Sequence, residues 1–434
     1  MKITRPFVFI AALLGAVFIA SVLSVTVTKT SYSQSYPAVV CPPTLPGLAS
    51  QISLSSKQTP FQRLQVRTTK TAPVKVLRLP VNQDSLIFES EGVASVVWQS
   101  KAGFWAGGAV CTASAASQWF VGGTSDVTTR GRLIIVNSGL SDAIVDIDAF
   151  TENGKQPLRT INVSSKNYNV ISLDSLAPGD KNLVVNVAPR SGRINAFMVD
   201  ERGKGLKAIG GDLVNSISGA SKNIYIPAIP HKISQSSKPA THIVRILTPG
   251  EIDASVGIEV LSADGVFVPV GLTSLTISPG IVTEFELNPK IASKVMGIRI
   301  TATEPVFASV RSTVGVSGRS DFVWSTAAPE LTPLTMAITG LDPLISFIGE
   351  DINVSVDVTL INGKVIQRKI QGSDIATWQI PESARSIAIT KVGKATYAGA
   401  LVSSVNGYGY FPVIQGSPLT KVEIPDSNIR VLNP

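Results

Sequence analysis

The sequence predicts an all-β protein, and three observations lead to this prediction. Short runs in which apolar and polar residues alternate, such as residues 74–79, recur along the chain, and this period is typical of strands with one buried face. Val, Ile, Thr and Ser are abundant, which favours strands over helices. Turn signals such as Asn153-Gly154 separate the runs, and beyond the N-terminal segment no long amphipathic helix is evident.

The N-terminal segment is the clearest local signal. Lys2 and Arg5 precede an uncharged, apolar run at residues 7–27, which as a helix would span about 30 Å, the thickness of a bilayer core. We therefore expect residues 1–28 to form a transmembrane signal anchor, with the cytoplasmic membrane as a partner. The basic residues before the run predict a single-pass membrane protein with a cytoplasmic N-terminus and an extracytoplasmic body. The alternative is a signal peptide whose cleavage leaves a secreted protein.

The chain has two cysteines, Cys41 and Cys111. Residues 29–60 are rich in Ser, Thr, Gln and Pro, which predicts a linker, and Cys41 lies within it. In an exported chain two cysteines most simply form a disulfide, and closing a loop of about 70 residues would stabilise the fold by about 4 kcal/mol in the chain-entropy model. The alternative is a free reactive thiol. A metal site would need more ligands, so no metal and no cofactor are predicted.

An internal repeat organises the rest of the chain. Residues 148–155 align turn for turn with residues 259–266, and residues 170–178 align with residues 284–292, so the offset stays at about 111–114 residues. A third copy runs through residues 354–402. A repeat of this length, built from short strands and turns, is typical of tandem immunoglobulin-like β-sandwich domains.

The repeat predicts the domain boundaries. We count four repeats and expect the first to be atypical, because it is shorter and carries a cysteine. The predicted domains are an atypical β domain tied to Cys41 and three β-sandwiches: residues 61–125, 126–230, 240–328 and 345–434.

Residues 96–123 hold three of the five Trp, and the pattern there predicts a strand, a Gly-rich loop and a second strand at residues 119–121. In this interpretation Trp98 and Trp119 fill a core, while Trp105 lies exposed in the loop at residues 101–108. Aromatic faces stack on the apolar faces of sugars. Trp105, Phe104 and Lys101 are therefore the candidate ligand-binding residues.

No catalytic pattern is present. The sequence lacks G-x-S-x-G and the G-K-[ST] of a phosphate-binding loop. The two histidines, His231 and His242, are placed in the Pro- and Ser-rich link between the second and third repeats and are expected to be solvated. Asp146 and Asp148 share one face of a predicted strand, which is typical of an exposed polar face rather than of a carboxylate pair that hydrolyses glycans. The chain is therefore not predicted to be an enzyme.

The net charge of +8 raises the question of an anionic partner. The longest basic cluster lies at residues 367–369 and has no interleaved aromatic residues, so nucleic acid is not predicted. Attraction to an anionic cell envelope fits the same charge.

Residues 111–125, C-T-A-S-A-A-S-Q-W-F-V-G-G-T-S, together with G-R-L-I-I-V-N-S at residues 131–138, resemble a family of actinobacterial extracytoplasmic proteins of unknown function. Its members carry one N-terminal membrane segment and a long β-rich body, and they are often encoded beside large membrane glycosyltransferases. Similar members keep an N-terminal Cys-Pro, here Cys41-Pro42, which supports the Cys41–Cys111 bridge. The resemblance implies a cell-envelope location and a glycosyltransferase partner, and it supplies no catalytic residues.

The leading hypothesis is a non-catalytic cell-envelope protein. It would be a surface stalk or an accessory subunit of envelope glycan assembly that presents β-sandwich loops to a partner. The alternative is an extracellular glycan-binding module that uses the loop at residues 101–108. A carbohydrate-active enzyme is the more remote alternative.

Overall fold

A computed structural model describes residues 4–22, 39–55, 58–73, 75–88, 93–205, 207–232, 240–316 and 318–417. The chain divides into two compact units, Pro37–Leu419 and the two terminal segments Met1–Tyr36 and Thr420–Pro434. The terminal unit contains helix α1 (Thr4–Val22). None of the helices in the described ranges is long and apolar enough to cross a membrane. Residues 23–27 of the predicted membrane segment and residues 29–38 of the predicted linker lie outside the described residues.

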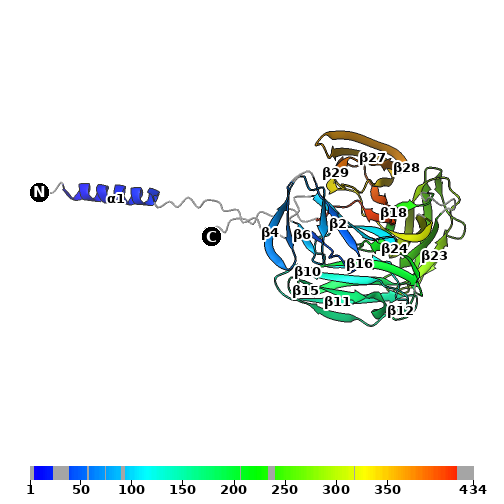
Figure 1. Ribbon diagram of the computed structural model, residues 1–434. Helices are drawn as coiled ribbons and strands as arrows, with labels where there is room; N and C mark the ends of the chain where they lie inside the picture. The colour runs from blue at the N-terminus through cyan, green and yellow to red at the C-terminus, as the bar shows by residue number, and fades with distance from the viewer. Residues whose placement is uncertain are drawn as a thin grey trace. The chain divides into compact units, whose positions relative to one another are not determined.

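The unit Pro37–Leu419 is built almost entirely from strands, which confirms the all-β class (Figure 1). We divide it into four regions by strand number. The first region holds β1–β8, and β7 and β8 pair as an antiparallel hairpin. Its two sheets have the orders β1-β6-β3-β4 and β8-β7-β2-β5. The bounds are β1 (Val39–Cys41), β2 (Ala49–Ser53), β3 (Thr59–Arg63), β4 (Val66–Ala72), β5 (Arg78–Val81), β6 (Leu86–Phe88), β7 (Val93–Lys101) and β8 (Trp105–Val110).

The second region contains two facing sheets, of order β12-β11-β15-β9 and β14-β10-β16-β17. Apolar residues of both sheets, such as Val145 and Val187 of one and Leu133 and Met198 of the other, meet in a single buried cluster. The bounds are β9 (Gln118–Val121), β10 (Arg132–Asn137), β11 (Ala143–Thr151), β12 (Gly154–Lys155), β13 (Arg159–Val163), β14 (Asn167–Ser172), the short 3₁₀ helix η1 (Leu173–Ser175), β15 (Val184–Ser191), β16 (Ile194–Lys204) and β17 (Lys207–Val214).

The third region repeats the pairing of the second, with the orders β18-β24-β20-β21 and β23-β19-β24-β25. Strand β24 belongs to both sheets, because its first part pairs with β18 and β20 and its last part with β19 and β25. The bounds are β18 (Ser221–Pro230), β19 (Thr241–Leu247), β20 (Ala254–Ser262), β21 (Gly265–Phe267), β22 (Leu275–Ile277), β23 (Thr283–Leu287), β24 (Val295–Val316) and β25 (Arg319–Thr326).

The fourth region follows the same pattern, with the orders β26-β29-β27-β28 and β28-β27-β30-β31. Its bounds are β26 (Leu334–Ala337), β27 (Leu344–Leu360), β28 (Val365–Gln379), β29 (Ala384–Lys391), β30 (Tyr397–Ser403) and β31 (Tyr408–Pro412).

The turns of the second and third regions that were aligned from the sequence also correspond in detail. Thr151 Oγ1 donates to the Gly154 carbonyl, and Ser262 Oγ makes the same bond to Gly265.

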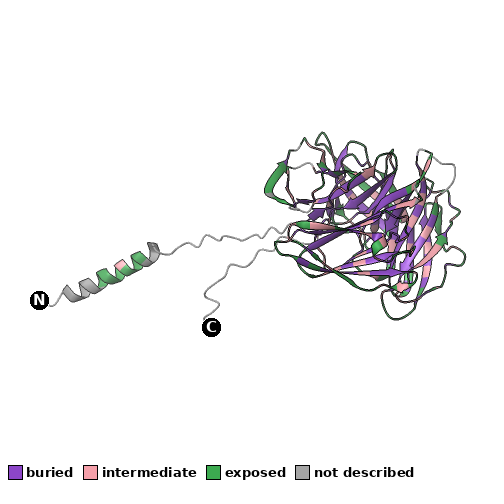
Figure 2. Cartoon of the chain, turned by 60° about the horizontal axis from the view of Figure 1, so that its bottom comes forward, coloured by how far each residue is buried: buried purple, intermediate pink, exposed green. Residues whose placement is uncertain are grey.

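The four regions succeed one another around the unit, which the colours in Figure 1 follow from β4 and β6 through β11 and β15 to β23 and then β27–β29. The last strand of each region, namely β8, β17, β25 and β31, lies innermost in the unit. Strands β8 and β25 both contact β17, and both also contact β31. Buried apolar clusters cross each junction, so much of the strand area is buried, as Figure 2 shows.

Strand pairing also links residues on either side of the predicted domain boundaries. Strand β9, which the sequence assigns to the first domain, pairs with β15, and β18 pairs with β24. Strand β26 pairs in parallel with β7, so the first and fourth regions share one sheet. The boundaries at residues 61–125, 126–230, 240–328 and 345–434 stay a prediction.

Candidate functional site

The expectation of an exposed Trp105 is wrong. Strand β8 begins at Trp105 and pairs with β7, so the predicted loop is a tight hairpin turn. The Trp105 side chain is 0% exposed and packs with Phe197 and Leu213 of the second region. The physical reason is the burial of a large apolar surface at a junction between regions, which outweighs the loop character that the neighbouring glycines suggest.

Glycines make this burial possible. A Cβ at Gly211 would lie 2.9 Å from ring atoms of Trp105, and a Cβ at Gly107 would lie 2.6 Å from the Leu213 backbone nitrogen. Strands β8 and β17 therefore approach more closely than larger residues permit. The paired glycines of the sequence mark strand-to-strand contacts rather than a flexible loop.

Lys101 and Phe104 stay at the surface. Phe104 is 46% exposed, and the Lys101 ammonium lies 5.6 Å from the centre of its ring. Lys101 Nζ also donates to Glu201 Oε1 at 2.5 Å, an ion pair between the first and second regions. Of the three candidate residues, the structure therefore keeps two together at the surface.

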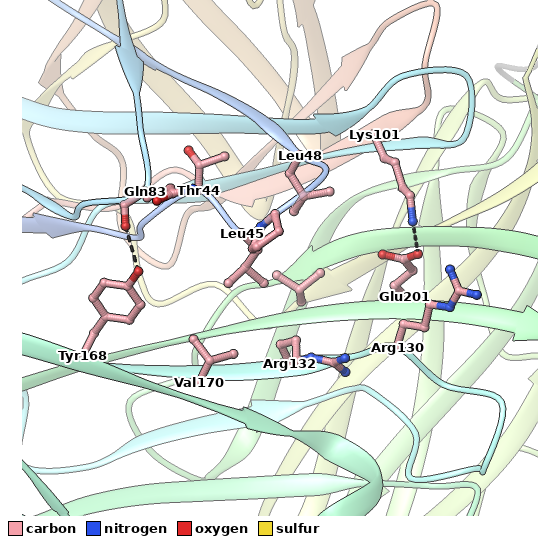
Figure 3. Close-up of a pocket in the computed structure, with 12 residues that line it drawn as sticks. Thr44, Leu45, Leu48, Gln83, Lys101, Arg130, Arg132, Tyr168, Val170 and Glu201 are labelled. Atoms are coloured by element: carbon pink, nitrogen blue, oxygen red, sulfur yellow. Dashed lines mark hydrogen bonds and ion pairs between the residues drawn. The ribbon is translucent and has the colours of Figure 1, made fainter.

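Lys101 lines a cavity of about 630 Å³ between the first and second regions, which we call the cationic pocket (Figure 3). The first region supplies the segment after β1, with Leu45 and Leu48, and the second supplies Val170 from the opposite side. Val199 of the second region also lines the cavity. Tyr168 closes one end and donates from its hydroxyl to the Gln83 carbonyl at 2.8 Å. The complete lining is Thr44, Leu45, Pro46, Leu48, Gln83, Lys101, Arg130, Arg132, Tyr168, Val170, Val199 and Glu201.

The charge of this pocket is positive. Lys101, Arg130 and Arg132 face one carboxylate, Glu201, so the lining carries a net charge of +2. Arg130 is exposed, whereas Arg132 is half-buried and donates to Ser172 Oγ at 3.0 Å. Guanidinium groups bind carboxylates and phosphates through paired N–H donors. The pocket can therefore hold an anionic ligand that also has an apolar face against the leucine and valine side chains.

The disulfide predicted between Cys41 and Cys111 is present, and both residues are fully buried. It joins β1 to the segment that follows β8. Residues just after Cys41 line the cationic pocket. The bond therefore fixes one wall of the pocket to the end of the β7–β8 hairpin.

The histidines are not solvated, contrary to expectation. His231 Nδ1 and His242 Nε2 lie 3.0 Å apart, His242 Nδ1 lies 2.8 Å from Ser312 Oγ, and both rings are buried. Burial lowers the pKa of His242 to about 3, with the neighbouring His231 contributing. The reason for the difference is that β19 begins before His242 and carries it into the sheet.

The carboxylates predicted to share a polar face are held in ion pairs. Asp146 accepts a hydrogen bond from Arg190 at 2.6 Å, which lowers its pKa, and Thr160 contributes to the same shift. Asp148 pairs with Lys155 at 2.7 Å. Within the described ranges, no group of three or more His, Cys, Asp or Glu could hold a metal ion.

Sequence reasoning missed most of the pocket. Arg132, Tyr168 and Glu201 come from three separate strands, β10, β14 and β16, so their proximity is a tertiary property. One local signal was available. Arg132 begins β10 and Arg130 lies two residues before it, and in extended backbone this spacing is typical of side chains that point to the same side.

Comparison with curated proteins finds no match. A crystal structure of Thermotoga maritima 1070 is 15% identical over 26% of this chain and 95% of its own, with a TM-score of 0.21. A crystal structure of the tetra-tandem repeat in the extending region of a large adhesion protein is 13% identical over 86% of this chain and 92% of its own, with a TM-score of 0.13. Residues 69–369 match the model of a family of unknown function, DUF5719. Since this match spans more than half of the sequence, the chain belongs to the DUF5719 family.

Proposed function

We propose that this chain is a non-catalytic cell-envelope protein that binds an acidic glycan in the cationic pocket, as an accessory subunit of envelope glycan assembly. The observation that carries the proposal is the pocket itself, whose lining combines three cationic side chains and one carboxylate with apolar leucine and valine side chains. Acidic sugars have both parts of the matching chemistry, namely a carboxylate or phosphate and the apolar face of a pyranose ring.

Two further features support an extracytoplasmic setting. Disulfides persist in oxidising compartments, and Cys41–Cys111 is closed. The net charge of +8 favours residence next to an anionic surface. The proposal includes an anchor at residues 7–27 in the cytoplasmic membrane of an actinobacterial cell, immunoglobulin-like domains in tandem, and a membrane glycosyltransferase as partner.

A surface stalk without glycan affinity is the second candidate, and one observation favours it. The hairpin turns of three regions are tied together, since Gly103 N donates to Asn406 Oδ1 at 3.0 Å and Arg319 donates to the carbonyls of Gly103 and Val405. Turns connected in this way form a rigid surface on which a protein partner can dock without a ligand in the pocket.

Calorimetry on the full chain tests the proposal with two probes of equal length, trigalacturonic acid and neutral maltotriose. We expect the acidic probe to bind in the cationic pocket. Arg132→Gln should weaken that binding about ten- to hundredfold, because a charge-assisted hydrogen bond contributes about 1.5–3 kcal/mol. Raising the salt concentration should also weaken it.

The matched control is Arg190→Gln on β15. It removes the same positive charge, here from an exposed ion pair between Arg190 and Asp146. It should leave the affinity for the acidic probe unchanged. Equal losses in both variants would show that only the net charge matters and would refute a pocket. Capture of a membrane partner without any affinity for trigalacturonic acid would favour the stalk, and cleavage of the probe would show an enzyme.

A further inference from the structure

A second cavity lies where the four innermost strands end. The segments that follow β8, β17, β25 and β31 meet around a space of about 550 Å³, which we call the serine-rich pocket. Its lining includes residues within 112–118, 216–221, 327–330 and 412–416. All four regions therefore contribute to one cavity, whose size is in the range of ligand-binding pockets.

The chemistry of this lining differs from that of the cationic pocket. Glu330 is the one charged side chain in the lining, and the polar groups are otherwise hydroxyls and amides. They belong to Thr112, Ser114, Ser117, Gln118, Ser216, Ser218, Ser221, Asn223, Tyr397 and Gln415. Hydroxyls and primary amides both donate and accept hydrogen bonds, so the pocket suits a ligand that does the same.

Several of these groups are available to a ligand. Within the described part of the chain, the side chains of Ser218 and Asn223 and the hydroxyl of Tyr397 make no hydrogen bond, and Ser218 and Asn223 are exposed. Glu330 is oriented by the Ala395 N–H, which donates to its Oε1 at 2.8 Å.

One of the two aromatic rings in the lining, that of Tyr397, is held in place. Tyr397 stacks on Tyr225 with ring centres 3.8 Å apart and an angle of 10° between the planes. A ring fixed from one side loses little conformational entropy when a ligand packs beside it. Elsewhere the lining includes small residues such as Ala113, Gly219 and Ala328, whose side chains leave space for a ligand.

We propose that the serine-rich pocket binds an uncharged sugar. The ligand class follows from donors and acceptors in similar number, the near absence of charge and a fixed aromatic side chain, which together match the hydroxyls and the apolar face of a neutral pyranose. An acidic sugar fits less well, because Glu330 would repel it. The site is separate from the cationic pocket, with which it shares no lining residue.

Saturation-transfer NMR on the full chain tests the site with four neutral trisaccharides: maltotriose, cellotriose, mannotriose and xylotriose. At least one should receive saturation at millimolar concentration. Asn223→Ala and Tyr397→Phe should each weaken its binding about fivefold, because each removes one hydrogen bond to the sugar. Neither change should alter the melting temperature, since Asn223 is exposed and Phe keeps the stacked ring.

Tyr168→Phe is the matched control, because it removes the same hydroxyl from the cationic pocket. It should leave neutral-sugar binding intact. The proposal is overturned if none of the four sugars receives saturation, or if both pocket variants bind as the wild type does. Binding of trigalacturonic acid that is lost in Arg132→Gln would still support the cationic pocket, so the two proposals fail separately.

Discussion

Arg245 and Asp321 are both buried, both belong to the third region, and both reach into a neighbouring region, but their surroundings differ. Arg245 on β19 donates from Nη1 to the carbonyls of Gly123 and Leu183 of the second region, both at 2.7 Å. Its Nε and Nη2 donate to Glu284 at 2.8 and 2.6 Å. The guanidinium is therefore matched by acceptors and by a counter-charge.

Asp321 on β25 has less support. Its Oδ1 accepts a hydrogen bond from the Gly211 N–H at 3.1 Å, and none of the ion pairs between described residues includes it. Burial raises the pKa of Asp321 to about 8, and the N–H groups of Phe322 and Gly211 offset only part of that effect.

The difference shows what a buried charge needs at a junction between regions. Burial also lowers the pKa of Arg245, but the Glu284 carboxylate opposes the shift and the guanidinium stays protonated at neutral pH. For Asp321 the Arg319 charge and the neighbouring N–H groups offset only part of the effect of burial on the pKa, so near neutral pH its favoured form is the protonated carboxyl. The first residue stabilises a junction as an ion, and the second makes a junction sensitive to pH.

The largest expected effect is the loss of Arg245. Arg245→Met should lower the free energy of unfolding by about 3–5 kcal/mol, because it leaves Glu284 and two carbonyls without their buried partner. Chemical denaturation measures this. Arg190→Met, which breaks an exposed ion pair with Asp146, should cost about 0–1 kcal/mol. Similar losses of stability in the two variants would show that the buried ion pair of Arg245 contributes no more than the exposed ion pair of Arg190.

The second effect is the pH dependence that Asp321 imposes. Its pKa is about 8 in the folded chain and near 3.8 when unfolded, so the folded state binds the proton more tightly. Stability from this group is present below pH 3.8 and is lost as pH rises through 8. Wild-type stability should fall by about 2 kcal/mol between pH 6 and pH 8 on account of this group.

Asp321→Asn should remove that decline while preserving the shape of the side chain. Denaturation curves of both proteins at pH 6, 7 and 8 give the comparison. The difference between their slopes reports the Asp321 carboxyl together with its effect on Asp212, whose pKa the Asp321 charge also raises. An unchanged slope in the variant would mean that Asp321 is ionised throughout and that solvent or a cation reaches it.

The parts of this architecture that sequence predicted are local. The turn at Asn153-Gly154 and the aligned turn within residues 259–266 occur where the pattern predicts them, because the residues that form each turn are adjacent in the chain. The bridge between Cys41 and Cys111 was predictable for a different reason, since the chain has no other cysteine.

Most of what the sequence did not predict depends on contacts between residues far apart in the chain. Gly107 and Gly108 resemble a loop until the approach of β17 and β31 is known, so Trp105 could not be recognised as a core residue. Arg245 gives no sign in the sequence that its partners are carbonyls more than 60 residues away. The cationic pocket likewise joins segments that the chain separates, and their packing decides which charges face one another.

The smallest expected effect concerns His242, a buried base that, like Asp321, has no ion partner. Its ring lies between His231 and Ser312, and burial holds its pKa at about 3 against 6.5 in the unfolded chain. The unfolded chain therefore takes up the proton first. The resulting stability is present above pH 6.5 and is lost as pH falls towards 3, which is opposite in sign to Asp321.

Between pH 7 and pH 5.5 this group should reduce wild-type stability by about 1 kcal/mol. His231 acts in the same direction, since burial and then Lys232 lower its pKa, while a backbone hydrogen bond to Ile291 and the charge of Asp264 oppose the shift. In His242→Gln an amide can bond to both neighbours without titrating, so the decline should be smaller even if the variant is less stable at every pH. The slope of stability against pH, rather than its absolute value, is therefore the measurement. An equal slope in both proteins would mean that His242 takes up a proton in the folded chain as readily as in the unfolded chain. The inference that a buried group without an ion pair stays neutral, drawn from Asp321, would then be wrong for His242.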